Sequence, residues 1–228
     1  MKQANIISDF PRLPEDILQQ AAQFQTAILA DVSGRRGAMH GRIRPLDSRM
    51  SVAGTALTVD VRPGDNLMIH AAIDLAQPGD VLVIDGKGDQ TSALLGAIMV
   101  AMCKARHISG VVVDGAVRDS IEIQNPDFPV FCMGTNPNGP TKNWAGRIGH
   151  PVSAGGVTVS SGDLIVGDAD GIVVVERHRI SDVLVAAESK VAEEAETIAS
   201  VRAGKKRGPW LTLALRKAGV LAESETLQ

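Results

Sequence analysis

The sequence of 228 residues contains no tyrosine, four phenylalanines and two tryptophans, so aromatic side chains make up only 3% of it. Proteins that stack single-stranded nucleic acid on aromatic platforms, or bind partners through aromatic-rich surfaces, need more of them. An excess of positive charge is also missing, since 23 Lys and Arg stand against 26 Asp and Glu. Because nucleic-acid binders neutralise phosphates with a basic surface, the composition predicts no nucleic-acid partner.

Cysteines and long hydrophobic runs are scarce as well. Cys103 and Cys132 are the only cysteines, without a CxxC or Cys/His spacing, so we expect two buried thiols in a reducing compartment and no zinc site. No apolar run reaches the roughly 18 residues that a membrane span needs, and the N-terminal segment has no signal-peptide core. We therefore expect a cytoplasmic protein without membrane contact, in which residues 1–228 form a single domain.

Short aliphatic runs dominate the middle of the chain, where a turn leads into four or five apolar residues that usually end in Asp-Gly. Such runs are typical of strands at the buried centre of a sheet. A further strand alternates polar and apolar residues, and the Gly-rich stretch 134–162 is expected to form hairpins and loops. The predicted strands cover residues 54–61, 81–85, 111–114, 164–168 and 172–176.

Helical patterns occur between and around these runs. Residues 93–106 are apolar on nearly all sides and predict a buried helix, which completes a βαβ crossover between parallel strands and indicates an α/β fold. Residues 14–30 predict an amphipathic helix that begins at Pro14. Apolar residues at steps of three and four over 180–198 predict another, and 210–218 a last short one. The basic segment GKKRG between the last two is expected to be a solvated linker.

Two residues in the turn that follows a predicted parallel strand are candidates for binding chemistry. Arg118 and Asp119 follow the strand 111–114, at the edge where open α/β sheets bind ligands. An arginine fork can grip a carboxylate, and an adjacent aspartate can hold a hard cation such as Mg²⁺. Gly96 near a helix start exposes backbone N–H groups to an anion. The alternatives are a surface ion pair for Arg118 and Asp119, and close packing for Gly96.

The segments PGDNLMIHAAIDLAQPGDVLVIDG, GAIMVAMCKARHISGVVVDGAVRD, FPVF and GDLIVGDADGIVVVERHR resemble one family. It contains the regulator of ribonuclease activity A and the class II 4-hydroxy-4-methyl-2-oxoglutarate / 4-carboxy-4-hydroxy-2-oxoadipate aldolases. The resemblance covers about residues 20–204 and leaves 205–228 as a C-terminal tail helix; its VxDGxxRD motif is fairly specific. It implies a layered β/β/α swivelling-domain sandwich, assembled as a homotrimer or homohexamer with active sites between subunits.

The resemblance also implies roles for individual residues. In the aldolases the arginine of the motif binds the pyruvyl carboxylate and the aspartate holds Mg²⁺ or Mn²⁺, which correspond to Arg118 and Asp119. Pyruvate is also held by backbone amides after the helix glycine and by an asparagine, and a C-terminal glutamate reaches a neighbouring subunit's site. The corresponding residues are Ile98, Met99, Asn66 and Glu194.

The helical periodicity places Glu194 at the edge of an apolar stripe, as it does Glu188, and a glutamate that simply reaches solvent is the alternative. The chain departs from the aldolases at Ala97, where they carry an acidic residue, and from the ribonuclease regulator in possessing Asp119.

Other candidates are weaker. Asp89 is expected in an exposed turn, although it could supply the charge missing at Ala97. His70 and His107 are expected to be core or surface histidines. Lys142 could reach a distal carboxylate of a substrate. The Arg-rich loop around His40 could line an anionic pocket or an interface.

Together these features predict a divalent-metal-dependent lyase that acts on small 2-oxo acids. It would cleave 4-hydroxy-2-oxo acids to release pyruvate, decarboxylate oxaloacetate, or do both. The alternative from another class is a non-catalytic ring that binds a ribonuclease or another protein. A third possibility is an enzyme on the same scaffold whose chemistry is altered by Ala97.

Overall fold

The computed structural model describes residues 5–204, 208 and 210–225. The chain divides into two compact units, Met1–Ala187 and Glu188–Gln228, and each is described by itself. The boundary falls inside helix α6 (Ile180–Arg202). The predicted basic linker, Lys205–Arg207, lies outside the described residues.

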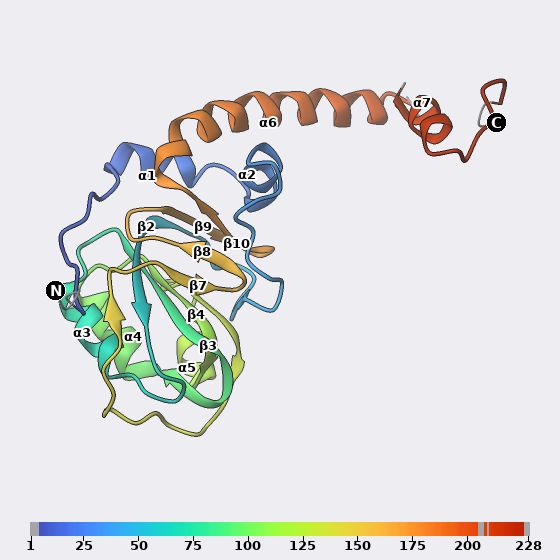
Figure 1. Cartoon of the computed structure of the whole chain (residues 1–228). Coiled ribbons are helices and arrows are strands. Elements are labelled where there is room, and N and C mark those ends of the chain that lie inside the picture. Colours follow the sequence, from blue (N-terminus) through green and yellow to red (C-terminus); the bar gives the residue numbers. More distant parts are fainter. Residues whose placement is uncertain (1–4, 205–207, 209, 226–228) are drawn as a thin grey trace. The chain divides into compact units, whose positions relative to one another are not determined.

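An eight-stranded mixed sheet forms the centre of the first unit (Figure 1). Its strand order is β1-β5-β4-β3-β2-β9-β10, with β6 also paired to β2. Strands β2 to β5 run parallel to one another, and β9 and β10 extend the sheet as an antiparallel hairpin. The strands are β1 (Arg44–Pro45), β2 (Val52–Asp60), β3 (Asp80–Leu95), β4 (Gly110–Val117), β5 (Val130–Thr135), β6 (Arg147–Ile148), β9 (Leu164–Asp168) and β10 (Gly171–Val175).

Side chains that alternate along the central strands contribute to separate cores on opposite faces of the sheet, and a third core joins β9 and β10 to α1 (Glu15–Ala21), α2 (Thr26–Val32) and the start of α6. Leu82 and Ile84 of β3 belong to the core beneath the crossover helices α3 (Leu67–Leu75), α4 (Ala97–Ala105) and α5 (Ser120–Ile123). Val81 and Val83 belong to the core beneath a separate hairpin of β7 (Val152–Ala154) and β8 (Val157–Val159). This sheet between a helical layer and a second β layer confirms the predicted β/β/α architecture and its βαβ units.

The predicted helix 14–30 is wrong as one element, because the structure contains α1 (Glu15–Ala21) and α2 (Thr26–Val32) with a break between them. At the break, the backbone N–H and hydroxyl of Thr26 donate to the Asp168 carboxylate at 2.8 and 2.7 Å. The Asp168 side chain on β9 therefore accepts hydrogen bonds at the N-terminus of α2, so a new helix begins at Thr26.

The predicted helix 93–106 begins later than expected, at Ala97, because β3 continues through Leu95. The last pair in the register of β3 and β4 is Leu95 with Val117, so residues 93–95 lie in the sheet. The helix is also not buried on all sides, since Ile98 is 76% exposed. The helix thus starts at the edge of the sheet, with Gly96 as its N-cap residue.

Two helices near the C-terminus match their predicted positions: α6, and α7 (Trp210–Lys217) in the second unit. The first turns of α6 are buried through Ile180, Val183, Leu184 and Ala187, whereas Val191 and Ile198 further along the same stripe are exposed. Among the described residues, no helix is both long and apolar enough to cross a bilayer.

Candidate functional site

A cavity of about 180 Å³ opens where α4 begins and β4 ends. It is lined from three sides: by the start of α3, by the junction of β3 and α4 together with the residues after β4, and by the loop 139–142. Every predicted site residue of the first unit lines this one cavity, namely Asn66, Gly96, Ile98, Met99, Arg118 and Asp119. This is the carboxyl edge of the parallel strands, where ligands are expected to bind.

Arg118 and Asp119 are held in place by backbone contacts with the neighbouring strand and helix. The Arg118 N–H donates to the Leu95 carbonyl at 2.9 Å. Asp119 has a left-handed backbone (φ 58°, ψ 39°), which aspartate tolerates better than most residues. Its Oδ2 accepts the Ala97 N–H at 2.9 Å and lies 3.8 Å from Arg118 Nε. The carboxylate therefore sits at the N-terminus of α4, beside the guanidinium.

Two glycines make room for this pair. A Cβ at Gly96 would lie 2.4 Å from Asp119 Oδ2 and 2.9 Å from Arg118 Cγ. A Cβ at Gly139 would lie 2.7 Å from Arg118 Nη1. Both contacts are far inside normal van der Waals distance, so a side chain at either glycine would displace the Arg118 or Asp119 side chain.

The first three backbone N–H groups of α4 differ in whether they have a hydrogen-bond acceptor. The Ala97 N–H donates to Asp119, and the Met99 N–H donates to the Gly96 carbonyl at 3.1 Å. The Ile98 N–H has no hydrogen-bond partner in the described part of the chain. Of the two amides that the resemblance implied, Ile98 is thus the one with a free donor, and Met99 contributes its side chain to the cavity wall.

Helix α3 supplies a polar wall. The Asn66 side chain donates from Nδ2 to the Leu94 carbonyl at 3.1 Å and to Met99 Sδ at 3.2 Å, while its buried Oδ1 has no partner within the described residues. His70 lies one turn further along, and its Nε2 is likewise buried without a partner in that part of the chain. Burial and the nearby charge of Lys142 lower the pKa of His70, and Asp74 raises it less.

Sequence reasoning missed His70, which it assigned to core or surface positions. The signal was its spacing of four residues from Asn66, which places both side chains on one face of the helix.

The loop that carries Lys142 is tied to the start of α3 by a buried carboxylate. Asp65 accepts the Thr141 hydroxyl at 2.6 Å, the Asn143 N–H at 2.7 Å and the Leu67 N–H at 3.0 Å. Burial alone would raise the pKa of Asp65, but these hydrogen bonds outweigh it and lower the pKa. Lys142 lies between two of the residues that Asp65 holds, and it lines the cavity, as the sequence analysis allowed.

Comparison with known proteins identifies the family. A family model described as RraA-like, Aldolase/RraA, matches residues 11–174. The chain belongs to the RraA-like family. A Halalkalibacterium halodurans protein whose name gives 4-hydroxy-4-methyl-2-oxoglutarate aldolase as a provisional activity is 41% identical over 179 residues, which cover 78% of this chain and 85% of that protein.

Solved structures of similar proteins share the fold. Streptomyces coelicolor RraAS2, titled an unusual member of the RNase ES inhibitor RraA protein family, has a TM-score of 0.77 at 28% identity, over 83% of this chain and 98% of that one. The RNA-processing inhibitor RraA from Thermus thermophilis has a TM-score of 0.61 at 27% identity, over 66% of this chain and 92% of that one. The family and the fold expected from the sequence motifs are therefore confirmed.

In this RraA-like chain, the cavity offers one carboxylate to a metal ion. Among the described residues, no group of three or more His, Cys, Asp or Glu side chains could hold a metal. Asp119 alone does not make a closed cage of the kind that structural zinc occupies. It does fit Mg²⁺ or Mn²⁺, which keep several waters and bind through one or two carboxylates plus oxygens of the substrate. The Asp119 side chain is 37% exposed, which leaves space for those waters.

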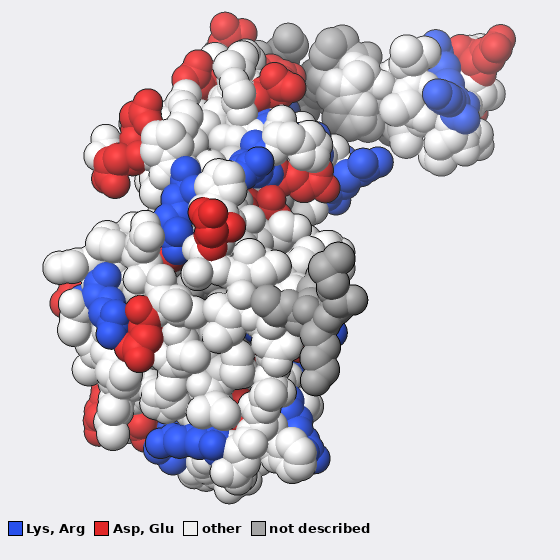
Figure 2. All heavy atoms as spheres, turned by 60° about the vertical axis from the view of Figure 1, so that its left-hand side comes forward, with Lys and Arg blue, Asp and Glu red and all other residues white. Residues whose placement is uncertain are grey.

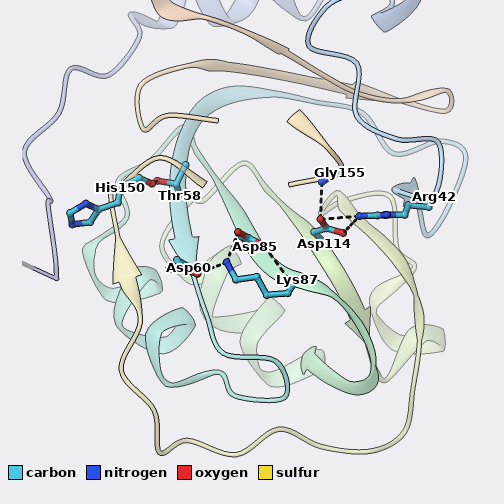
Figure 3. A network of polar contacts seen from close by, with 8 residues as sticks. All are labelled: Arg42, Thr58, Asp60, Asp85, Lys87, Asp114, His150 and Gly155. Carbon is cyan, nitrogen blue, oxygen red and sulfur yellow. Dashed lines mark hydrogen bonds and ion pairs between the residues drawn. The ribbon is translucent and has the colours of Figure 1, made fainter. Parts of the chain in front are cut away.

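Other carboxylates on β2, β3 and β4 are neutralised by basic side chains (Figure 3). Lys87 Nζ donates at 2.6 Å both to Asp60 and to Asp85. Asp114 accepts the Gly155 N–H at 2.8 Å and Arg42 Nη2 at 3.1 Å. None of these residues lines the cavity. The Arg-rich loop thus contributes Arg42 to a structural ion pair.

The remaining predicted residues lie elsewhere in the RraA-like chain. Glu194 is in the second unit, where its carboxylate is 3.5 Å from Lys190 Nζ, and it is not among the lining residues. Asp89 is half-buried and lies within β3, where it pairs with Gly115 of β4, so the exposed turn expected for it is wrong; its carboxylate accepts the N–H and hydroxyl of Thr91. On the face in Figure 2, Lys and Arg are scattered among Asp and Glu and form no extended basic patch.

Proposed function

We propose that the chain is a divalent-metal-dependent lyase that acts on small 2-oxo acids. It cleaves 4-hydroxy-2-oxo acids to release pyruvate, decarboxylates oxaloacetate, or does both, since both reactions pass through the enolate of pyruvate. The observation that carries the proposal is the meeting of Arg118, Asp119 and the N-terminus of α4 in one cavity of about 180 Å³. The provisional activity in the name of the H. halodurans relative supports it.

Each group at the site has a role in this reaction. The Arg118 guanidinium binds the substrate carboxylate through paired hydrogen bonds, and the free Ile98 N–H at the helix N-terminus adds a further donor. Asp119 holds Mg²⁺ or Mn²⁺, which when bound supplies Lewis acidity toward the oxygens of the oxo acid. Lys142 places a second positive charge on the wall of the cavity, which favours an oxo acid with a further carboxylate.

A pyruvate-coupled screen of 4-hydroxy-2-oxo acids and oxaloacetate, with Mg²⁺, with Mn²⁺ and with EDTA, tests the proposal. We expect pyruvate release that requires the metal and falls by at least ~100-fold in Arg118→Ala and Asp119→Ala. Arg49→Ala is a matched control, because Arg49 is an exposed arginine paired with Asp47 and does not line the cavity. Full activity in either cavity variant, or equal activity in EDTA, would refute the proposed function.

We also propose that the active enzyme is a homotrimer or homohexamer, in which Glu194 serves the site of a neighbouring subunit. This extends the role that the family resemblance implies for the C-terminal glutamate. Sedimentation analysis tests the assembly. Mixing Glu194→Ala with Arg118→Ala chains tests the shared site, because subunits that complement one another should recover part of the activity. Failure to recover activity in a mixed assembly would count against the role of Glu194.

The two solved RraA relatives, which are named for inhibition of an RNase and of RNA processing, favour a second candidate, a non-catalytic ring that binds a ribonuclease. This candidate predicts no Mg²⁺ binding by calorimetry, no pyruvate release from any 2-oxo acid, and inhibition of a ribonuclease at stoichiometric concentration. Calorimetry with Mg²⁺ separates the two, since the lyase needs the ion at Asp119 and the regulator does not.

A further inference from the structure

Two polar atoms on α3 lack the partners that buried polar atoms normally have. Asn66 is 3% exposed, and because its Nδ2 donates to the Leu94 carbonyl, its Oδ1 must act as an acceptor. Neither this Oδ1 nor His70 Nε2 has a hydrogen bond within the described residues, and both residues line the cavity. An unsatisfied buried polar atom is destabilising and rare in folded proteins, so two on adjacent turns of one helix indicate a ligand that completes them.

Among the described residues that line the cavity, one side chain is suited to accept a proton near neutral pH. The titratable groups that line it are His70, Arg118, Asp119 and Lys142. Arginine and lysine are cationic and carry no free lone pair. The Asp119 carboxylate accepts the Ala97 N–H and is the group that we assign to the metal. Ala97 itself has no side chain that could take up a proton. A neutral imidazole is left as the base.

We propose that His70 is the general base of carbon–carbon bond cleavage, and that Asn66 Oδ1 accepts a hydrogen bond from a different donor of the bound ligand. This rests on the proposed function. His70 Nε2 takes the proton of the 4-hydroxyl group, and the oxygen lone pair forms the carbonyl of the departing fragment. The electrons of the C3–C4 bond form the enolate of pyruvate. The imidazolium then returns the proton to C3, so the cycle consumes no proton and needs no further reactant.

The charges around His70 keep it in the required form. Lys142 faces it from the loop 139–142, and Asp74 lies one turn along α3, where it is already paired with Arg106. Arg118 and Asp119 complete the ring of charges at the cavity. With its pKa lowered by burial and by Lys142, the imidazole is neutral at pH 7 and becomes inactive only when the pH falls through that pKa.

The two reactions of the proposed lyase separate this role from a structural one. Oxaloacetate loses CO₂ from a carboxylate that is already ionised, so its bond cleavage needs no base. We therefore expect His70→Gln to lower kcat for cleavage of a 4-hydroxy-2-oxo acid by ~10²–10⁴-fold and to change oxaloacetate decarboxylation by only a few-fold. The acid limb of the pH–rate profile for aldol cleavage should disappear in the variant.

His107→Asn is the matched control, because His107 is exposed, outside the cavity, and has a positive φ of 57° that asparagine tolerates. Urea unfolding of each variant checks the fold, and His70→Asn replaces His70→Gln if the latter is unfolded. Equal loss of both activities in a folded variant, or an unchanged pH profile, would overturn the proposal for His70 alone.

Wild-type protein that decarboxylates oxaloacetate but cleaves no 4-hydroxy-2-oxo acid would also overturn it, since His70 would have no hydroxyl to act on. Wild-type protein with neither activity would refute the proposed function itself.

Discussion

Replacing Gly96 with alanine tests whether the cavity depends on a close approach of three segments. The backbone there is extended (φ −150°, ψ −167°), a conformation that alanine adopts without strain. The effect of the substitution is therefore steric, and it falls on the two side chains that we assign to substrate and metal. The added methyl would lie 2.4 Å from Asp119 Oδ2 and 2.9 Å from Arg118 Cγ.

The size of the required movement follows from these distances. A carbon–oxygen contact relaxes near 3.4 Å, so the Asp119 carboxylate must move by about 1 Å, and overpacking of this kind costs ~1–3 kcal/mol of stability. Because Asp119 is held by the Ala97 N–H, the movement also breaks or lengthens the 2.9 Å hydrogen bond at the start of α4. A misplacement of about 1 Å at a catalytic group lowers the rate by ~100-fold.

Three measurements check this prediction: pyruvate release in the presence of Mg²⁺, Mg²⁺ affinity by calorimetry, and urea unfolding. We expect Gly96→Ala to remain folded at 25 °C while activity falls by ~100-fold and Mg²⁺ affinity falls with it. Gly41→Ala is the control, since a Cβ there meets nothing closer than Arg44 Nη2 at 3.8 Å. If Gly96→Ala keeps wild-type activity and metal affinity, the close approach is not functional and the assignment of the site is wrong.

Three further predictions concern carboxylates. Asp119→Asn keeps an acceptor for the Ala97 N–H, and asparagine tolerates the left-handed backbone, so the stability of the variant should stay within ~0.5 kcal/mol of wild type. Mg²⁺ binding should be lost in calorimetry, and retained binding would contradict the metal assignment. Asp65→Ala should lose ~1–3 kcal/mol in urea unfolding at pH 7. Because the folded-state pKa of Asp65 is lowered, its contribution is present above the unfolded pKa and is lost as the pH falls through the folded pKa. The stability difference should therefore shrink as the pH falls below 3.8, and a constant difference would refute the linkage. Asp168→Ala should cost ~1 kcal/mol and lower Tm by a few degrees, because Thr26 loses its acceptor; an unchanged Tm would show that α2 does not need it.

Features that depend on local pattern could be predicted from the sequence. The apolar runs 81–85 and 111–114, which end in Asp-Gly, form parts of β3 and β4, and the run 164–168 forms β9, because short fully apolar runs are typical of strands at the buried centre of a sheet. The pair Arg118–Asp119 was also predictable, since residues that follow a parallel strand must lie at the ligand-binding edge. Both inferences need only the neighbours in the sequence.

Features that depend on distant contacts could not be predicted in this way. The break between α1 and α2 is set by Asp168, which lies 142 residues after Thr26. Lys142 is brought to the cavity by Asp65, which holds Thr141 across 76 residues. For His70, the helical pattern predicted which face it shares with Asn66 but not that this face would line a cavity. A periodic pattern identifies a face, whereas the groups that cover that face come from elsewhere in the chain.

The aspartates on β3 and β4 show why residue type alone does not identify the carboxylate that we propose for the metal. Asp85 and Asp114 end two apolar runs in the same way, but Lys87 and Arg42 neutralise them. Asp119 lies two residues beyond the end of β4, and only its Oδ2 is used, by the Ala97 N–H; Oδ1 has no hydrogen bond in the described part of the chain. The helix N-terminus and the neighbouring arginine stabilise the negative charge of this carboxylate but bind only one of its oxygens. The other oxygen therefore remains available to a cation. That difference, rather than the Asp-Gly motif, is why we propose Asp119 as the metal-binding carboxylate of this edge of the sheet.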